Sequence, residues 1–231
     1  DAHHNVIIDR GTGIDNRHMG IKALSAQTAG PQGIHHNLIK RARHQGILPG
    51  GLVHTNEIYL DSFDTNSFGI KPVTEVYKNR IFGTGYHVVA VGWGSDITVR
   101  DNFVNLQGVA PTNRSDEYGS QCSVNGFRLT QYGGATENYE NNLYYGNTIV
   151  VKGRDGCGTM RGVQFSSDPY VRNLVFRQNT IKTFVQGENT GLAPCVVAHG
   201  LHGRNHEQLP IIYRDNVFMS NSVLVRFGDD Y

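Results

Sequence analysis

Long apolar runs and a charge surplus are both missing from this chain. A helix that crosses a membrane needs about 20 mainly apolar residues, and since no run comes near that length, we expect no membrane insertion. The 21 basic residues are balanced by 20 acidic ones. The chain therefore lacks the basic surplus of a general nucleic-acid-binding protein. It also has no basic, apolar and small-residue leader, so we expect any secretion signal to have been removed already or never to have been part of this sequence.

Cysteine is scarce too, and its three copies are an odd number. They are either unpaired thiols or one disulfide and one free thiol. The spacing does not choose a pair among Cys122, Cys157 and Cys195.

A short pattern recurs along the chain. It consists of an apolar residue, two polar residues, an Asn, one variable residue and a second large apolar residue, as in IIYRDNVF (Ile211–Phe218) and LVFRQNTI (Leu174–Ile181). Internal repeats of this kind decide the fold. The Asn positions of the copies are Asn37, Asn56, Asn79, Asn102, Asn142, Asn179 and Asn216.

The spacing of these copies predicts a β-solenoid. The shortest gap, from Asn37 to Asn56, is 19 residues, whereas a strand–helix–strand unit needs about 30. Helical periodicity is missing, and a second strand, often opened by Gly, follows each Asn. We predict an all-β, right-handed parallel β-helix of about eight coils. It forms one domain over residues 1–231, either a fragment or an uncapped unit whose ends stack on other copies.

Side chains alternate along a strand, so the pattern predicts which positions are buried. The apolar residues three before and two after each Asn are expected in the core. The Asn side chains are expected to point inward as a hydrogen-bonded ladder. The residues two before each Asn are then expected to face solvent.

The repeat resembles that of the right-handed parallel β-helix superfamily, the pectin-lyase-like fold. IIYRDNVF and LVFRQNTI carry the resemblance most clearly. It implies an extracellular protein that binds or cleaves polysaccharides, like the pectate and alginate lyases, polygalacturonases, epimerases and phage tailspikes. The chain has no NTD…DD…GHG set, no DPHD and no RxPxxR. No catalytic residue of a member family can therefore be transferred to it.

One candidate site comes from the predicted outward positions. β-Elimination on a uronic acid needs a base for the C5 proton, a cation for the carboxylate and an acid for the leaving oxygen. His, Lys, Arg and Tyr side chains supply these roles, but the same residues also suit an ordinary solvated face. The candidate catalytic residues are His35, His54, Tyr77, Lys78 and Arg100.

Further basic and aromatic residues are candidates for substrate binding. Three insertions, 108–123, 152–161 and 186–194, fall at the same place in successive coils and are expected to line one edge. The candidate binding residues are Arg177, Arg214, Lys71, Arg128, Trp93 and Tyr118.

Two other sets of residues suggest weaker alternatives. His199, His202 and His206 have a spacing that suits Zn²⁺, but they lie in a Gly-rich stretch without a fixed face, so we assign no metal site. An acidic set would support glycoside hydrolysis or Ca²⁺ binding, so we expect either no cofactor or Ca²⁺. The set is Asp61, Asp64, Asp116, Glu117, Asp155, Asp168, Asp229 and Asp230.

We therefore expect an extracellular polysaccharide-binding protein. If it is an enzyme, elimination on a uronate-containing glycan is favoured over hydrolysis. The alternative is a non-enzymatic structural or adhesive solenoid that associates end to end.

Overall fold

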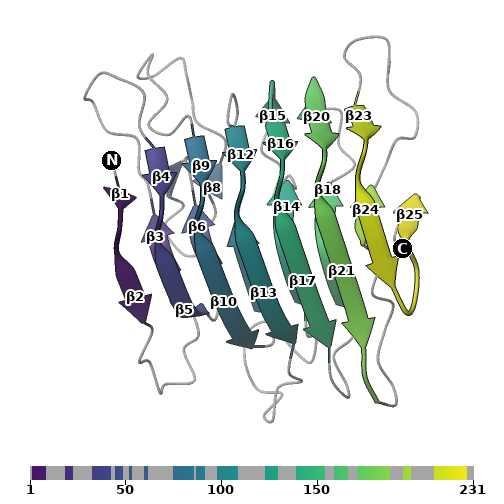
Figure 1. The fold of residues 1–231 in the computed structure, drawn as a ribbon, viewed down its shortest axis with the longest axis horizontal. Coiled ribbons are helices and arrows are strands. Elements are labelled where there is room, and N and C mark those ends of the chain that lie inside the picture. Colours follow the sequence, from purple (N-terminus) through teal and green to yellow (C-terminus); the bar gives the residue numbers. More distant parts are fainter. Residues whose placement is uncertain are drawn as a thin grey trace.

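The computed structural model describes residues 2–8, 19–22, 33–42, 45–48, 52–53, 60–61, 75–85, 87–91, 98–108, 123–129, 139–153, 159–165, 171–187, 195–198 and 211–227. Every regular element in these ranges is a β-strand. The strands form three seven-stranded sheets and two small pairs (Figure 1). The three large sheets are parallel throughout. The all-β, parallel architecture predicted from the repeat is thereby confirmed for this part of the chain.

The three large sheets, named A, B and C here, take their strands in chain order. Sheet A contains β1 (Ala2–His3), β4 (Gly33–His35), β9 (Glu75–Tyr77), β12 (Thr98–Arg100), β16 (Leu143–Tyr145), β20 (Leu174–Arg177) and β23 (Ile211–Arg214). Sheet B contains β2 (Val6–Ile8), β5 (Leu38–Ala42), β10 (Arg80–Gly85), β13 (Phe103–Gly108), β17 (Thr148–Gly153), β21 (Thr180–Val185) and β24 (Val217–Ser220). Sheet C contains β3 (Met19–Lys22), β6 (Gln45–Leu48), β11 (His87–Val91), β14 (Ser123–Leu129), β18 (Thr159–Phe165), β22 (Val196–Ala198) and β25 (Val225–Phe227).

The small pairs are β15 (Tyr139–Glu140) with β19 (Val171–Arg172), which is parallel, and β7 (Leu52–Val53) with β8 (Leu60–Asp61), which is antiparallel. In the large sheets the chain runs from A to B to C and returns to A beside its previous strand. One such triple of strands is called a rung below, and the described strands make seven rungs. The count of about eight coils stays a prediction.

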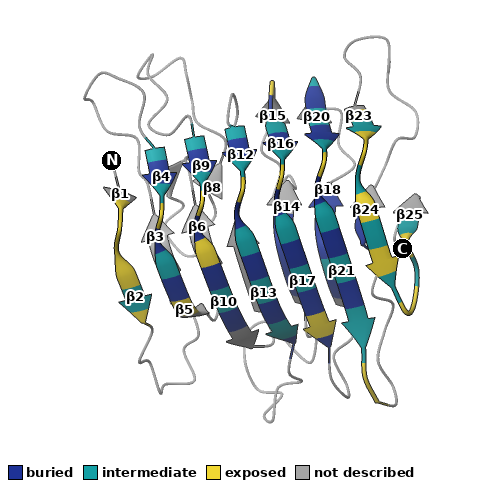
Figure 2. Ribbon diagram, in the orientation of Figure 1, coloured by how far each residue is buried: buried dark blue, intermediate teal, exposed yellow. Residues whose placement is uncertain are grey.

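One hydrophobic core is shared by the three large sheets. Strands such as β13 and β17 alternate between buried and half-exposed residues (Figure 2), because successive side chains leave a strand on opposite faces. The core joins Val76 and Phe176 of sheet A, Ile81 of sheet B, and Val124 and Phe127 of sheet C. As predicted, the apolar residues three before and two after a ladder Asn are buried in the inner rungs, while Ile7, Tyr213 and Phe218 of the end rungs are half-buried.

Two glycines of sheet C allow this core to pack closely. A Cβ at Gly126 would overlap the Ile149 side chain and the Gly162 carbonyl, and one at Gly162 would overlap Ile181 and the Cys195 carbonyl. The sequence pattern led us to expect Gly at the opening of the second strand. Both residues lie inside strands instead, and they leave room for side chains of sheet B.

A ladder of Asn side chains runs through all seven rungs, between sheets A and B. The backbone N–H and the Nδ2 of each Asn before Asn216 donate to Oδ1 of the Asn in the next rung, at 2.9–3.1 Å. Most Nδ2 groups also donate to a backbone carbonyl, as that of Asn102 does to Val76 at 2.9 Å. The ladder residues are Asn5, Asn37, Asn79, Asn102, Asn147, Asn179 and Asn216.

The residue before each ladder Asn turns the chain from sheet A into sheet B. It has a positive φ of 52–64° in every rung, a left-handed conformation that Gly and Asn tolerate best. Only one of the seven is Gly. The seven are His4, His36, Lys78, Asp101, Gly146, Gln178 and Asp215.

Two predicted ladder positions are wrong. Asn142 is buried, but it follows Asn141, another left-handed residue (φ 57°), at a corner between β15 and β16. That corner mimics the ladder motif five residues too early, so Tyr144 lies three before the true ladder residue, Asn147. The other is Asn56, which lies outside the described residues. It is not a rung between its presumed neighbours, because Asn37 bonds directly to Asn79.

Candidate functional site

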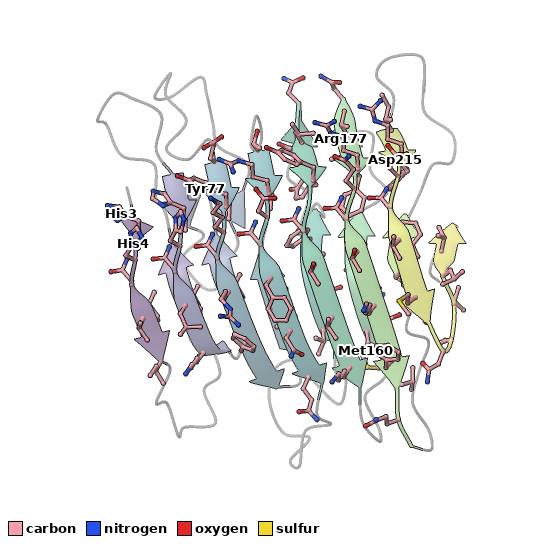
Figure 3. The ribbon with its side chains drawn as sticks, in the orientation of Figure 1. His3, His4, Tyr77, Met160, Arg177 and Asp215 are labelled. Carbon is pink, nitrogen blue, oxygen red and sulfur yellow. The ribbon has the colours of Figure 1, made fainter. Side chains whose placement is uncertain are left out.

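The residues two before each ladder Asn form a single file across sheet A, called the outward column here. The register of the parallel strands places each of them beside the next. None of them is fully buried, and in Figure 3 the polar side chains of this region line the upper part of the sheet. The column is His3, His35, Tyr77, Arg100, Tyr145, Arg177 and Arg214.

The first four members of the column stack on one another. The His3 and His35 rings lie 5.1 Å apart and within 7° of parallel. His35 lies 4.5 Å from Tyr77, with 15° between the rings. The Arg100 guanidinium lies over the other side of Tyr77, 4.1 Å from its centroid. Both faces of Tyr77 are therefore occupied, so it presents its edge, rather than a face, to a ligand.

Arg100 is held by neighbouring acids. Its guanidinium donates to Asp101 at 3.2 Å and lies 3.6 Å from Glu75. Partial burial acts to lower the pKa of Arg100, but the Asp101 hydrogen bond and the Glu75 charge outweigh it and raise the pKa. Part of the Arg100 charge is thus neutralised within the protein, and a ligand anion would compete with two carboxylates for it.

The C-terminal end of the column is different. Arg177 lies over the Tyr145 ring at 5.3 Å from its centroid, and Arg214 is exposed in the next rung. Within the described ranges neither of these arginines forms an ion pair with an acidic side chain. In this part of the chain two adjacent guanidinium groups therefore lack an acidic partner, and guanidinium binds anions through paired hydrogen bonds.

The predicted site residues fall into three groups. His35, Tyr77, Arg100, Arg177 and Arg214 share the outward column, and Lys78 is exposed at the adjoining turn. Arg128 lies in β14 of sheet C, and its side chain is not described. His54, Lys71, Trp93 and Tyr118 lie outside the described residues, as do all members of the acidic set except Asp61.

The predicted order of the column is wrong at one place. His54 was expected between His35 and Tyr77, but these two residues are direct partners on β4 and β9. Among the described residues, the chain between them contributes the β7–β8 pair and no further strand of sheet A.

Three members of the column or its turn were missed. His3, His4 and Tyr145 precede Asn5 and Asn147, which were not recognised as ladder residues. The signals were present: AHHNVI (Ala2–Ile7) repeats IHHNLI (Ile34–Ile39), and YYGNTI (Tyr144–Ile149) fits the pattern with Gly at the left-handed position.

Cys195 is free and buried. Its Sγ lies 3.3 Å from the Met219 carbonyl and 3.6 Å from the Thr183 hydroxyl, and burial raises its pKa. Of the three disulfides that the sequence left open, only the Cys122–Cys157 pair is compatible with this, and both of those residues lie outside the described ranges.

The strands and the ladder define an all-β protein of parallel sheets with a polar strip on one face. Comparison of the chain with protein-family models, curated proteins and solved structures gives no match. Nor do the described residues contain a helix long and apolar enough to cross a membrane. The resemblance to the pectin-lyase-like superfamily therefore depends on the repeat alone.

Proposed function

We propose that the chain is a right-handed parallel β-helix of the pectin-lyase-like kind, and that its outward column binds a linear acidic polysaccharide outside the cell. One observation carries the proposal: seven consecutive rungs present their outward residues in one register-matched file. With strands about 4.8 Å apart, the six intervals make a strip about 29 Å long. Such a strip suits an extended polymer better than a compact ligand.

The chemistry of the strip favours an anionic polymer. Half-buried Arg177 and exposed Arg214 carry charges without an acidic partner in the described part of the chain, and exposed Lys78 adds a third cation. Because ring faces in the column are covered by neighbouring rings or guanidinium groups, recognition relies on hydrogen bonds and charge rather than on stacking against sugar faces. Carboxylate groups on a polyuronate meet both requirements.

Binding is tested by titrating the protein with polygalacturonate and with a neutral glucan, using calorimetry. We expect binding to polygalacturonate only. One hydrogen bond to a charged group contributes about 1.5–3 kcal/mol, so the variant Arg177→Gln/Arg214→Gln should raise the Kd at least about tenfold.

The matched control removes two charges from sheet B. Lys152 in β17 and Lys182 in β21 lie outside the column, in the rungs of Tyr145 and Arg177. Lys152→Gln/Lys182→Gln should leave the Kd nearly unchanged. Equal losses in both variants would indicate binding by net charge alone, and no binding by the wild type would refute the proposal.

A second candidate function is β-elimination within the same strip. It is favoured by the direct contacts of Tyr77 with His35 and with Arg100, which bring an imidazole, a phenol and a guanidinium together. The test is the appearance of unsaturated uronates, followed by ultraviolet absorbance. Tyr77→Phe should abolish product formation while leaving binding intact, and a wild type that forms no product refutes this candidate only.

The non-enzymatic alternative remains a proposal as well. The first and last rungs expose Val6, Ile8, Val217 and Met219, and apolar edge strands favour association with other strands. If the chain assembles end to end, light scattering should show particles that grow with concentration in the micromolar range. A monomer at all concentrations would oppose this alternative.

A further inference from the structure

Four histidines form a cluster at the first two rungs. The sequence His-His-Asn occurs at His3–Asn5 and again at His35–Asn37, and in both copies the Asn belongs to the ladder. The first His of each copy lies in the outward column, and the second is the left-handed residue of the turn. Figure 3 shows His3 and His4 side by side at this end of sheet A.

Within each rung the two imidazoles are hydrogen-bonded to each other through their Nδ1 atoms, and a bound metal ion would take the place of that hydrogen bond. The Nδ1–Nδ1 distance is 2.9 Å between His3 and His4 and 2.8 Å between His35 and His36. The rings of each pair are nearly perpendicular, at 89° and 84°. Between rungs the rings are stacked, with centroids 5.1 Å apart for His3 and His35 and 5.0 Å apart for His4 and His36.

The backbone fixes both pairs. The His4 amide donates to the His35 carbonyl at 3.4 Å, and the His36 amide donates to the Tyr77 carbonyl at 3.2 Å. The ladder bond from Asn5 to Asn37 anchors the residue that follows each pair. The left-handed turn, rather than ring contacts alone, therefore brings consecutive histidines together.

We propose that each His–His pair is a two-nitrogen site for a divalent transition-metal ion with tetragonal coordination, for which Cu²⁺ is the probe. With metal–nitrogen bonds of about 2.0–2.1 Å, two nitrogens at a right angle lie about 2.9 Å apart, whereas tetrahedral ligands lie about 3.3 Å apart. The observed separations match the right angle, and square-planar nitrogen ligation is typical of Cu²⁺ and Ni²⁺.

Each rung would hold its own ion. No three His, Cys, Asp or Glu side chains in the described ranges form one metal-binding group, and the stacking distance separates the two pairs. Water would complete each coordination sphere, because His3, His4 and His36 are exposed.

Metal ions bind the neutral form of imidazole, so binding is tested at pH 7.5. This inference uses only the four imidazoles and does not depend on glycan binding.

The test is a Cu²⁺ titration at pH 7.5, followed by calorimetry and by electron paramagnetic resonance. Asn tolerates left-handed φ, so His4→Asn and His36→Asn should preserve the turn, which far-UV circular dichroism checks. We expect each of them to remove one bound ion per chain and the double variant to remove both. His87→Asn, in β11 of sheet C, is the control and should change nothing.

Electron paramagnetic resonance distinguishes two ions bound in adjacent rungs from ions bound at histidines that lie far apart. Ions in adjacent rungs would lie about 4.8 Å apart, so the fully loaded wild type should show a dipolar-coupled half-field signal. His36→Asn should abolish that signal and leave one uncoupled Cu²⁺ with two imidazole nitrogens. Unchanged stoichiometry in His36→Asn, or a loaded wild type without coupling, would overturn the proposal.

Discussion

The ladder and the outward column differ sharply although they are two residues apart in every rung. The ladder position is Asn in all seven rungs, while the column contains His, Tyr and Arg. The inward position must satisfy backbone groups of two rungs, and an amide can both donate and accept there. The outward side chain does not have to satisfy backbone groups of two rungs, so its residue type can suit a ligand instead. The inward residues therefore indicate the fold, and the function that we propose depends on the outward column.

The largest expected loss of stability comes from replacing a buried ladder Asn. Asn102→Ala removes the acceptor of the Asn79 amide and side chain and the donor to the Val76 carbonyl. Each buried group left without a partner costs about 1–3 kcal/mol. We expect the free energy of unfolding in urea to fall by about 3 kcal/mol or more.

The matched outward variant is Arg100→Ala, two residues away. Arg100 is partly buried and its acidic partners are more exposed; because ion pairs near the surface contribute only about 0–1 kcal/mol each, this change should cost clearly less than Asn102→Ala. Equal losses of unfolding free energy in Asn102→Ala and Arg100→Ala would show that the inward and outward positions do not differ in their contribution to stability.

A smaller effect is expected at the end of the ladder. Asn216 is only half-buried, and its Oδ1 and Nδ2 bond to Asn179 and to the Phe176 carbonyl. Because water can replace these partners, Asn216→Ala should cost about 1 kcal/mol, measured as for Asn102→Ala. A loss as large as that in the middle would show that the ladder acts as one cooperative unit instead of a series of local bonds.

Much of this comparison could be predicted from the sequence. Alternation of apolar and polar residues around Asn102, Asn179 and Asn216 predicted parallel strands, core positions and an inward ladder, because burial imposes a period of two. Tyr77, Arg100, Arg177 and Arg214 were assigned to solvent-facing positions for the same reason.

The exact set of rungs could not be predicted. The left-handed residue that marks the corner is His, Lys, Asp or Gln in six rungs, so the usual Gly signal is missing from most of them. A pattern with one fixed Asn then also fits Asn142 at another corner and Asn56 in the segment between two rungs. One false rung was enough to place His54 between His35 and Tyr77 and to hide their direct contact.

The turn residues provide a finer test. Gln178 is exposed with φ 53°, a conformation that costs a non-glycine residue roughly 1–2 kcal/mol. Glycine removes that cost, but the greater conformational freedom that it gives the unfolded chain lowers the stability of the folded state by about 0.5–1 kcal/mol. Gln178→Gly should therefore stabilise the protein by about 0.5 kcal/mol, measured by urea unfolding. A clear destabilisation would show that the Gln side chain contributes to the fold.

The smallest expected effect is a pH dependence at the N-terminal end of the column. The pKa values of His35 and His36 are lowered by desolvation and then by neighbouring histidines; Lys78 and Arg100 add to the lowering, and Glu75 opposes it at His35. The folded state thus binds fewer protons than the unfolded state below about pH 6.5, and stability falls as pH falls through that value. Between pH 7.5 and pH 5.5, the Tm of His36→Asn should fall less than the Tm of the wild type. If both lose the same amount, the carboxylates, and not the histidine cluster, control acid stability.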